Sequence, residues 1–120
     1  PLFLHKPYLL RHLDVASNRE AILHDIDLVA MTEQTITNLE ELHTNLDQIR
    51  RKGYAVSRGE WIIDASGTAA PIYDQRGQIT AAISISGPRQ RFTDEKIKEM
   101  AGLLVKEAAQ ISFDLGYYPR

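Results

Sequence analysis

The feature that most constrains the fold of this chain is a predicted β-hairpin within residues 68–93. Its second strand, residues 78–86, alternates strictly, and side chains two positions apart leave the same face of a strand. One face is apolar and carries Ile79, Ala81, Ile83 and Ile85. The opposite face is small or hydroxylated and carries Thr80, Ala82, Ser84 and Ser86. A face of this second kind leaves space beside the strand and supplies neutral hydrogen-bond donors.

A turn at residues 74–77 joins this strand to a preceding strand at residues 68–73. Aspartate at the first turn position and glycine at the fourth favour a type I turn in which Gly77 has a positive φ. Pro71, in the first strand, has no N–H to donate to a β-ladder. We therefore expect a bulge, a sheet edge or a pocket beside Pro71.

Helical periodicity predicts three helices before the hairpin. The first covers residues 9–13, and the second begins with an S-x-x-E capping box at Ser17 and continues to about residue 28. A second capping box at residues 37–40 begins the third helix, which ends at Gly53. Its apolar stripe consists of Leu39, Leu42, Leu46 and Ile49.

Two short strands are predicted at residues 54–56 and 61–63, and a last helix begins with Thr93 as its cap and ends at Gly116. The apolar stripe of this helix is Ile97, Met100, Ala101, Leu104, Ala108, Ile111 and Leu115. Helices segregated from an antiparallel hairpin are typical of α+β proteins. We expect one α+β domain over residues 1–120, an antiparallel sheet covered by helices. Because so few strands make a marginal sheet, we expect further strands upstream of Pro1.

The composition excludes several classes of protein. With a formal net charge of -2, the chain lacks the excess of basic residues that is typical of domains that bind nucleic-acid phosphates. The one basic cluster, at residues 50–52, ends a predicted helix and complements its dipole. The absence of cysteine excludes disulfides, thiol catalysis and cysteine-based zinc sites. No apolar run approaches the roughly 20 residues that cross a bilayer, so we expect no membrane partner.

No catalytic or metal-binding motif is present in the sequence. The four histidines have no i, i+4 pair, and the chain has no H-E-x-x-H, G-x-S-x-G, G-x-x-x-x-G-K or G-x-G-x-x-G motif. We expect a protein that is not an enzyme and that needs no cofactor or metal.

The hairpin remains the candidate site. Ser84 and Ser86 place two hydroxyls on one face, and residues 66–70 have small side chains or none. A small carboxylate could accept hydrogen bonds from these hydroxyls and from backbone N–H groups near Gly67. The same small residues would also allow a helix to pack tightly on the sheet. The spacing alone leaves both explanations open.

Several motifs together resemble the effector-binding domain of IclR-type transcriptional regulators. They are G-Y-A at residues 53–55, G-T-A-A-P-I at 67–72, A-A-I-S-I-S-G-P at 81–88 and R-F-T at 91–93. The segment at residues 31–37 also looks like the family's two-threonine segment that precedes the helix ending in G-Y-A. The resemblance covers the chain from about residue 5, and it is most specific between residues 53 and 93.

The resemblance implies a GAF- or profilin-like domain that senses a small carboxylate metabolite, such as a keto acid or a sugar acid. In that family a separate N-terminal winged helix-turn-helix binds operator DNA, and the proteins act in the cytoplasm as homodimers or homotetramers. The chain then looks like the C-terminal part of a longer regulator. The effector-binding residues that we expect are Ser57, Ala65, Gly67, Thr68, Ala69, Ser84 and Ser86.

Two of these positions depart from the family pattern. Gly67 stands where many relatives carry Cys, and Ser57 stands where an acidic ligand-contacting residue is common. These departures bear on which effector is bound. An alternative function is a pure oligomerisation module, in which the last helix or the helix ending at Lys52 presents an apolar surface. An enzyme acting on a small acid is the least favoured alternative, because no catalytic set is visible.

Overall fold

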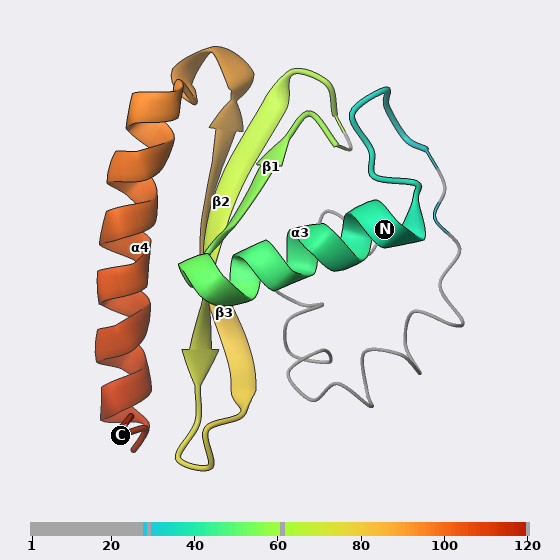
Figure 1. The fold of residues 1–120 in the computed structure, drawn as a ribbon. Helices are drawn as coiled ribbons and strands as arrows, with labels where there is room; N and C mark the ends of the chain where they lie inside the picture. The colour runs from blue at the N-terminus through green and yellow to red at the C-terminus, as the bar shows by residue number, and fades with distance from the viewer. Residues whose placement is uncertain (1–27, 29, 61, 120) are drawn as a thin grey trace.

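The computed structural model describes residues 28, 30–60 and 62–119, which form a sheet between two helices (Figure 1). The elements are α3 (Leu39–Lys52), β1 (Ala55–Arg58), β2 (Ala65–Tyr73), β3 (Ile79–Pro88), the 3-10 turn η2 (Arg89–Arg91) and α4 (Asp94–Asp114). All strands are antiparallel, in the order β1-β2-β3. The predicted α+β architecture is confirmed. The helices predicted at residues 9–13 and 17–28 lie outside the described residues, apart from Leu28.

The helix α3 begins one residue later than the capping box predicts. The Asn38 side chain, rather than that of Thr37, caps it by accepting a 3.0 Å hydrogen bond from the Glu41 N–H. The predicted end is confirmed: Gly53 has φ 85°, and its N–H donates to the Ile49 carbonyl. Of the predicted stripe, Leu39 is exposed while Leu42, Leu46 and Ile49 are buried.

The strand predicted at residues 61–63 is wrong at positions 62 and 63, and residue 61 lies outside the described residues. Ile62 and Ile63 lie in the turn between β1 and β2, and both are exposed. The Gly59 backbone (φ 65°) reverses the chain, and its N–H donates to the Ala65 carbonyl. The register places Arg58 opposite Ser66, so the described residues 59, 60 and 62–64 belong to the connection. Tertiary pairing therefore overrides the strand propensity of the isoleucines. β2 begins at Ala65, earlier than predicted.

A bulge in β3 corrects the predicted alternation. Ala81 pairs with Ile72, but Ile79 pairs with Tyr73, which leaves Thr80 as an extra residue. The bulge turns Ile79 to the opposite face from Ile83. The pairing of β2 with β1 ends at Ala69, which lies opposite Ala55. Among the described residues the strand β2 is consequently a local edge at Pro71, which agrees with the expectation for proline.

Two hydrophobic cores occupy the two faces of the sheet. The α3 face buries Ile36, Leu42, Leu46, Ile49, Ala55 and Ile79 in one cluster. The α4 face buries Ala70, Ile72, Leu104 and Ala108 in the other, with Ile83 packed against them. Successive residues of β2 thus serve opposite cores, as strand geometry requires.

The helix α4 is capped as predicted, since the Thr93 hydroxyl oxygen accepts from the Lys96 N–H at 3.2 Å. Its predicted stripe is correct at Ile97, Ala101, Leu104 and Ala108, all of which are buried. At the C-terminal end Ser112 is buried while Ile111 and Leu115 are exposed. Gly116, with φ 95°, follows the helix end.

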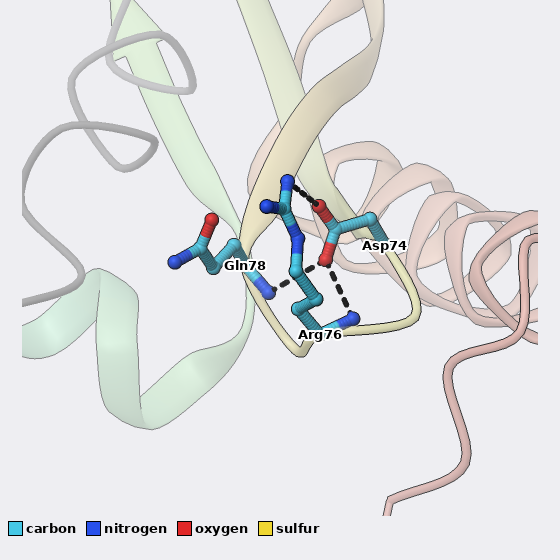
Figure 2. A network of polar contacts seen from close by, with 3 residues as sticks. All are labelled: Asp74, Arg76 and Gln78. Carbon is cyan, nitrogen blue, oxygen red and sulfur yellow. Dashed lines mark hydrogen bonds and ion pairs between the residues drawn. The ribbon is translucent and has the colours of Figure 1, made fainter.

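The turn between β2 and β3 is held by one carboxylate (Figure 2). The Asp74 Oδ1 atom accepts from the backbone N–H groups of Arg76 (2.8 Å) and Gln78 (3.1 Å), and Oδ2 lies 3.2 Å from the Arg76 guanidinium. Gly77 has φ 77°, and its N–H donates to the Asp74 carbonyl, as a type I turn predicts. Burial raises the pKa of the Asp74 carboxyl, but these hydrogen bonds and the Arg76 charge outweigh it, so the pKa is lowered.

Ser112→Ala is expected to destabilise the protein by about 1–3 kcal/mol. The Ser112 Oγ atom is buried, donates to the Ala108 carbonyl (2.7 Å) and accepts from the Tyr73 N–H (2.9 Å), so the variant removes an acceptor from a half-buried strand end. Urea unfolding measures the change. Ser84→Ala, at an exposed position, is the control and should stay within about 0.5 kcal/mol of the wild type. Equal stabilities of the two variants would contradict this role of Ser112.

Asp74→Asn is expected to lower stability at neutral pH and to matter less in acid. A lowered folded-state pKa means that the carboxylate stabilises the fold above the ordinary Asp pKa of about 3.9 and that this contribution disappears as the pH falls through the folded value. Urea unfolding of both proteins between pH 7 and pH 2 should show two free energies that converge at low pH. Asp64→Asn controls for the loss of one negative charge. A difference that is constant across this range would rule out the turn carboxylate as its source.

Candidate functional site

The α3 face of the sheet carries two rows of small side chains that cross the three strands. Directly paired residues on neighbouring strands leave the same face of a sheet. The strand register makes one row of Ser57, Gly67 and Ser86, and the next of Ala55, Ala69 and Ser84. We call these six residues the hydroxyl face. It joins side chains from β1, β2 and β3 that are up to 31 positions apart (86 − 55).

The helix α3 covers one end of this face. Its core cluster includes Ala55, and Ala69 beside it is also buried. Farther along the same face, Ser57 is half-buried and Ser84 and Ser86 are exposed. Among the described residues, then, the serine end of the face is the open end.

Most of the sequence-predicted site residues are brought together here. Ser57, Gly67, Ala69, Ser84 and Ser86 belong to the hydroxyl face, and Ala65 lies on the same side of β2, opposite Pro88. Thr68 does not join them, because adjacent strand residues point to opposite faces. Its side chain is buried, and its hydroxyl donates to the Ala55 carbonyl at 2.9 Å.

The hydroxyls of the described residues differ in what they bind. The hydroxyls of Thr68 and Ser112 are buried and form hydrogen bonds with backbone groups. Within residues 30–60 and 62–119, the side-chain hydroxyls of Ser57, Ser84 and Ser86 take part in none of the protein hydrogen bonds. The donors and acceptors of these hydroxyls are consequently available to a molecule that binds on this face.

Two threonine side chains hold the turn that follows Ser57. The sequence indicated these threonines only through the family pattern. The Thr32 and Thr35 hydroxyls donate to the backbone carbonyls of Gly59 and Glu60. The Thr35 oxygen also accepts from the Thr32 N–H at 3.0 Å. The segment before α3 thereby holds the β1–β2 turn, and with it the end of the hydroxyl face. The T-x-x-T spacing was the available signal for it.

A groove of about 620 Å³ lies elsewhere, between α3, β1 and the start of α4. Its charged lining mixes Lys52, Arg58 and Lys98 with Glu41, Glu60 and Asp94. The Arg58 guanidinium and the Asp94 carboxylate are 2.9 Å apart and link β1 to α4. None of the sequence-predicted site residues lines this groove, and no motif indicated it, because its residues come from separate elements.

The part of the chain that the structure describes contains no helix long and apolar enough to span a membrane. Nor does that part contain a group of three or more His, Cys, Asp or Glu side chains that could hold a metal ion.

Several proteins are similar to this chain in both sequence and fold. The HTH-type transcriptional regulator KdgR of Escherichia coli (strain K12) is 36% identical over 97 residues, which are 81% of this chain and 37% of KdgR. The crystal structure of the Thermotoga maritima IclR matches with a TM-score of 0.86 and 37% identity, over 93% of this chain and 44% of that one. The chain thus spans less than half the length of these two proteins.

A third similar protein was solved with a ligand. It is a double mutant of the PobR transcription factor inducer binding domain from Acinetobacter, in complex with 3-hydroxybenzoic acid. Its TM-score is 0.76 at 25% identity, over 89% of this chain and 61% of that one. The family model described as bacterial transcriptional regulator IclR C-terminal matches residues 8–113. This chain therefore belongs to the family of IclR-type transcriptional regulator C-terminal domains.

Proposed function

We propose that this chain is the effector-sensing domain of a transcriptional regulator and that it binds a small carboxylate on the hydroxyl face. The proposal is supported by the family and by relatives that are named as transcriptional regulators. The PobR inducer binding domain, solved with 3-hydroxybenzoic acid, is a relative whose ligand is a small carboxylic acid. The observation that carries the proposal is the placement of Ser57, Ser84 and Ser86 at the open end of one sheet face.

The chemistry of this face suits a small oxygen-rich anion. Hydroxyl groups donate hydrogen bonds to a carboxylate, and bonds to an ionised acceptor are stronger than neutral ones. The alanines of the second row and the isoleucines of the α3 core supply an apolar boundary. Small-molecule sites commonly combine such an apolar lining with a few placed polar groups.

Binding would act on DNA through a separate N-terminal winged helix-turn-helix, in a cytoplasmic homodimer or homotetramer. An effector changes operator affinity only if it binds one arrangement of the regulator better than another. The coupling is reciprocal, so operator DNA must change effector affinity by the same factor. Residues 1–120 would form the C-terminal part of such a regulator.

A second candidate function is oligomerisation without ligand binding. It is favoured by the large apolar side chains that α4 exposes, among them Leu103 and Phe113, each 55% exposed. Exposed apolar patches often mark protein–protein contacts. Under this alternative the hydroxyl face would bind nothing, so binding measurements separate the two candidates.

The double variant Ser84→Ala with Ser86→Ala is expected to lose effector binding and to keep its fold. Two hydrogen bonds to a charged group are at stake, so affinity should fall at least about tenfold. The measurement is titration calorimetry of the purified protein with pyruvate and gluconate, a keto acid and a sugar acid. Circular dichroism and thermal melting check the fold.

Ser66→Ala is the matched control, because Ser66 is a buried serine of β2 that points to the opposite face from Gly67 and pairs with Gly87. Its hydroxyl has no hydrogen-bond partner, so its removal should leave affinity unchanged. Unchanged affinity in the double variant would refute the site. If neither acid binds to or raises the melting temperature of the wild type, the oligomerisation function is favoured instead.

A further inference from the structure

The groove between α3, β1 and the start of α4 has a buried acidic residue in its lining. Glu60 is only 6% exposed, whereas the acidic residues Glu41 and Asp94 of the same groove are exposed. The backbone at Glu60 is held by the Thr35 hydroxyl, which donates to the Glu60 carbonyl oxygen. An ionised carboxylate accepts hydrogen bonds and donates none. The inner part of the groove is therefore suited to a donor group that carries positive charge.

A second acceptor lines the same groove and has no donor. It is the side-chain oxygen Oδ1 of Asn45, which is buried beside α3. Within the part of the chain that the structure describes, this oxygen accepts no hydrogen bond. Buried polar atoms nearly always have a partner, so an orphaned one needs an explanation. An ammonium group carries three donors and no acceptor, so it matches an amide oxygen as well as a carboxylate.

Basic side chains lie at the exposed rim of the groove. Lys52 ends α3, Lys98 lies near the start of α4, and both are exposed. Neither lysine forms an ion pair with an acidic residue among those described. Arg58, the third cation of the lining, is paired with Asp94. The two lysines are consequently available to an anionic group at the mouth of the groove.

The groove also has an apolar wall and enough room for a small molecule. Ile36, Ile49 and Ile97 line it, and all three are buried. Its volume of about 620 Å³ falls within the range of small-molecule pockets, roughly 300–1,000 Å³. An alkyl chain that joins two charged groups can cover this apolar surface.

We propose that this groove is a second ligand site and that it binds a small zwitterion with an ammonium and a carboxylate end. The ammonium group binds in the inner part, at Glu60 and Asn45. The carboxylate lies at the rim, near Lys52 and Lys98. None of the six residues of the hydroxyl face lines the groove, so binding here does not require a ligand on that face. A small acid without an amine meets only the exposed lysines and binds weakly here.

Titration calorimetry with matched probes tests this charge pattern. The zwitterion 6-aminohexanoate is compared with hexylamine and hexanoate, which keep the carbon chain and one charged end each, and 4-aminobutyrate serves as a shorter zwitterion. The better zwitterion should bind at least about tenfold more tightly than hexanoate, because hexanoate lacks the charged donor. It should bind about threefold more tightly than hexylamine, because exposed ion pairs contribute little. Failure of both zwitterions to bind, or equal binding of hexanoate, would overturn the proposal.

Two variants with matched controls locate the ammonium end. Glu60→Gln keeps the shape of the side chain and removes its charge, so zwitterion affinity should fall at least about tenfold. Asn45→Ala removes the orphaned acceptor and should cost about fivefold. Glu107→Gln removes one negative charge from an exposed position of α4, and Thr44→Ala truncates an exposed neighbour on α3; neither residue lines the groove. Both controls should bind as the wild type does.

The rim and the hydroxyl face are tested separately. Lys52→Gln with Lys98→Gln should abolish the preference for the zwitterion over hexylamine without weakening hexylamine. Ser84→Ala with Ser86→Ala should leave zwitterion affinity unchanged, and a tenfold loss in this variant would place the zwitterion on the hydroxyl face and refute the groove site.

Unchanged zwitterion affinity in both Glu60→Gln and Asn45→Ala would equally refute the site. Should these variants not fold, an amide NMR titration of the wild type with the zwitterion decides. Saturable shifts centred on Asn45, Tyr54 and Lys98 are expected, and shifts that avoid the residues of the groove would overturn the proposal.

Discussion

The register between β2 and β3 decides which side chains meet each helix. A shift of one residue would move every side chain of a strand to the other face. In this register Ala70 and Ile72 pack on α4, while Ala69 and Gly67 lie opposite, paired with Ser84 and Ser86. The packing of both cores and the composition of the hydroxyl face follow from this one pairing.

Two local features set that register. The turn closed by the Asp74 carboxylate fixes where the strands begin to pair. The bulge at Thr80 then changes the phase of β3, so Ile79 serves the α3 core and Ile83 the α4 core. Without the extra residue, filling the α3 core with Ile79 would turn Ser84 and Ser86 toward α4. The bulge thus lets one strand supply an apolar anchor and two hydroxyls to the same face.

Much of the architecture was predictable, because its signals are local. The Asp74–Gly77 turn, the Thr93 cap and the helix end at Gly53 each follow from one or two residues whose conformational preferences are strong. The errors have non-local causes. Ile62 and Ile63 favour a strand by themselves, yet the pairing of β1 with β2 places them in a turn. The bulge at Thr80 leaves no mark in an alternating sequence.

The candidate site was predictable to the extent that strand alternation holds. The period of two predicts that the hydroxyls of Ser84 and Ser86 leave the same face of their strand. The alignment of Ser57 with Gly67 depends on the β1–β2 register, and family resemblance, not spacing, pointed to Ser57. Thr68 is a neighbour of Gly67 and Ala69 along the chain, but its side chain points to the opposite face, as strand geometry requires. The groove near Asn45 and Lys98 draws on separate elements and had no sequence signal.

The central claim is that a small acid binds on the hydroxyl face and not in the groove between α3, β1 and α4. The most direct measurement is a two-dimensional amide NMR titration of the isotope-labelled protein with pyruvate. We expect the largest concentration-dependent shifts at the amides of Ser57, Gly67, Ser84 and Ser86. Shifts confined to groove residues such as Asn45, Tyr54 and Lys98, or no saturable shifts at all, would contradict the account.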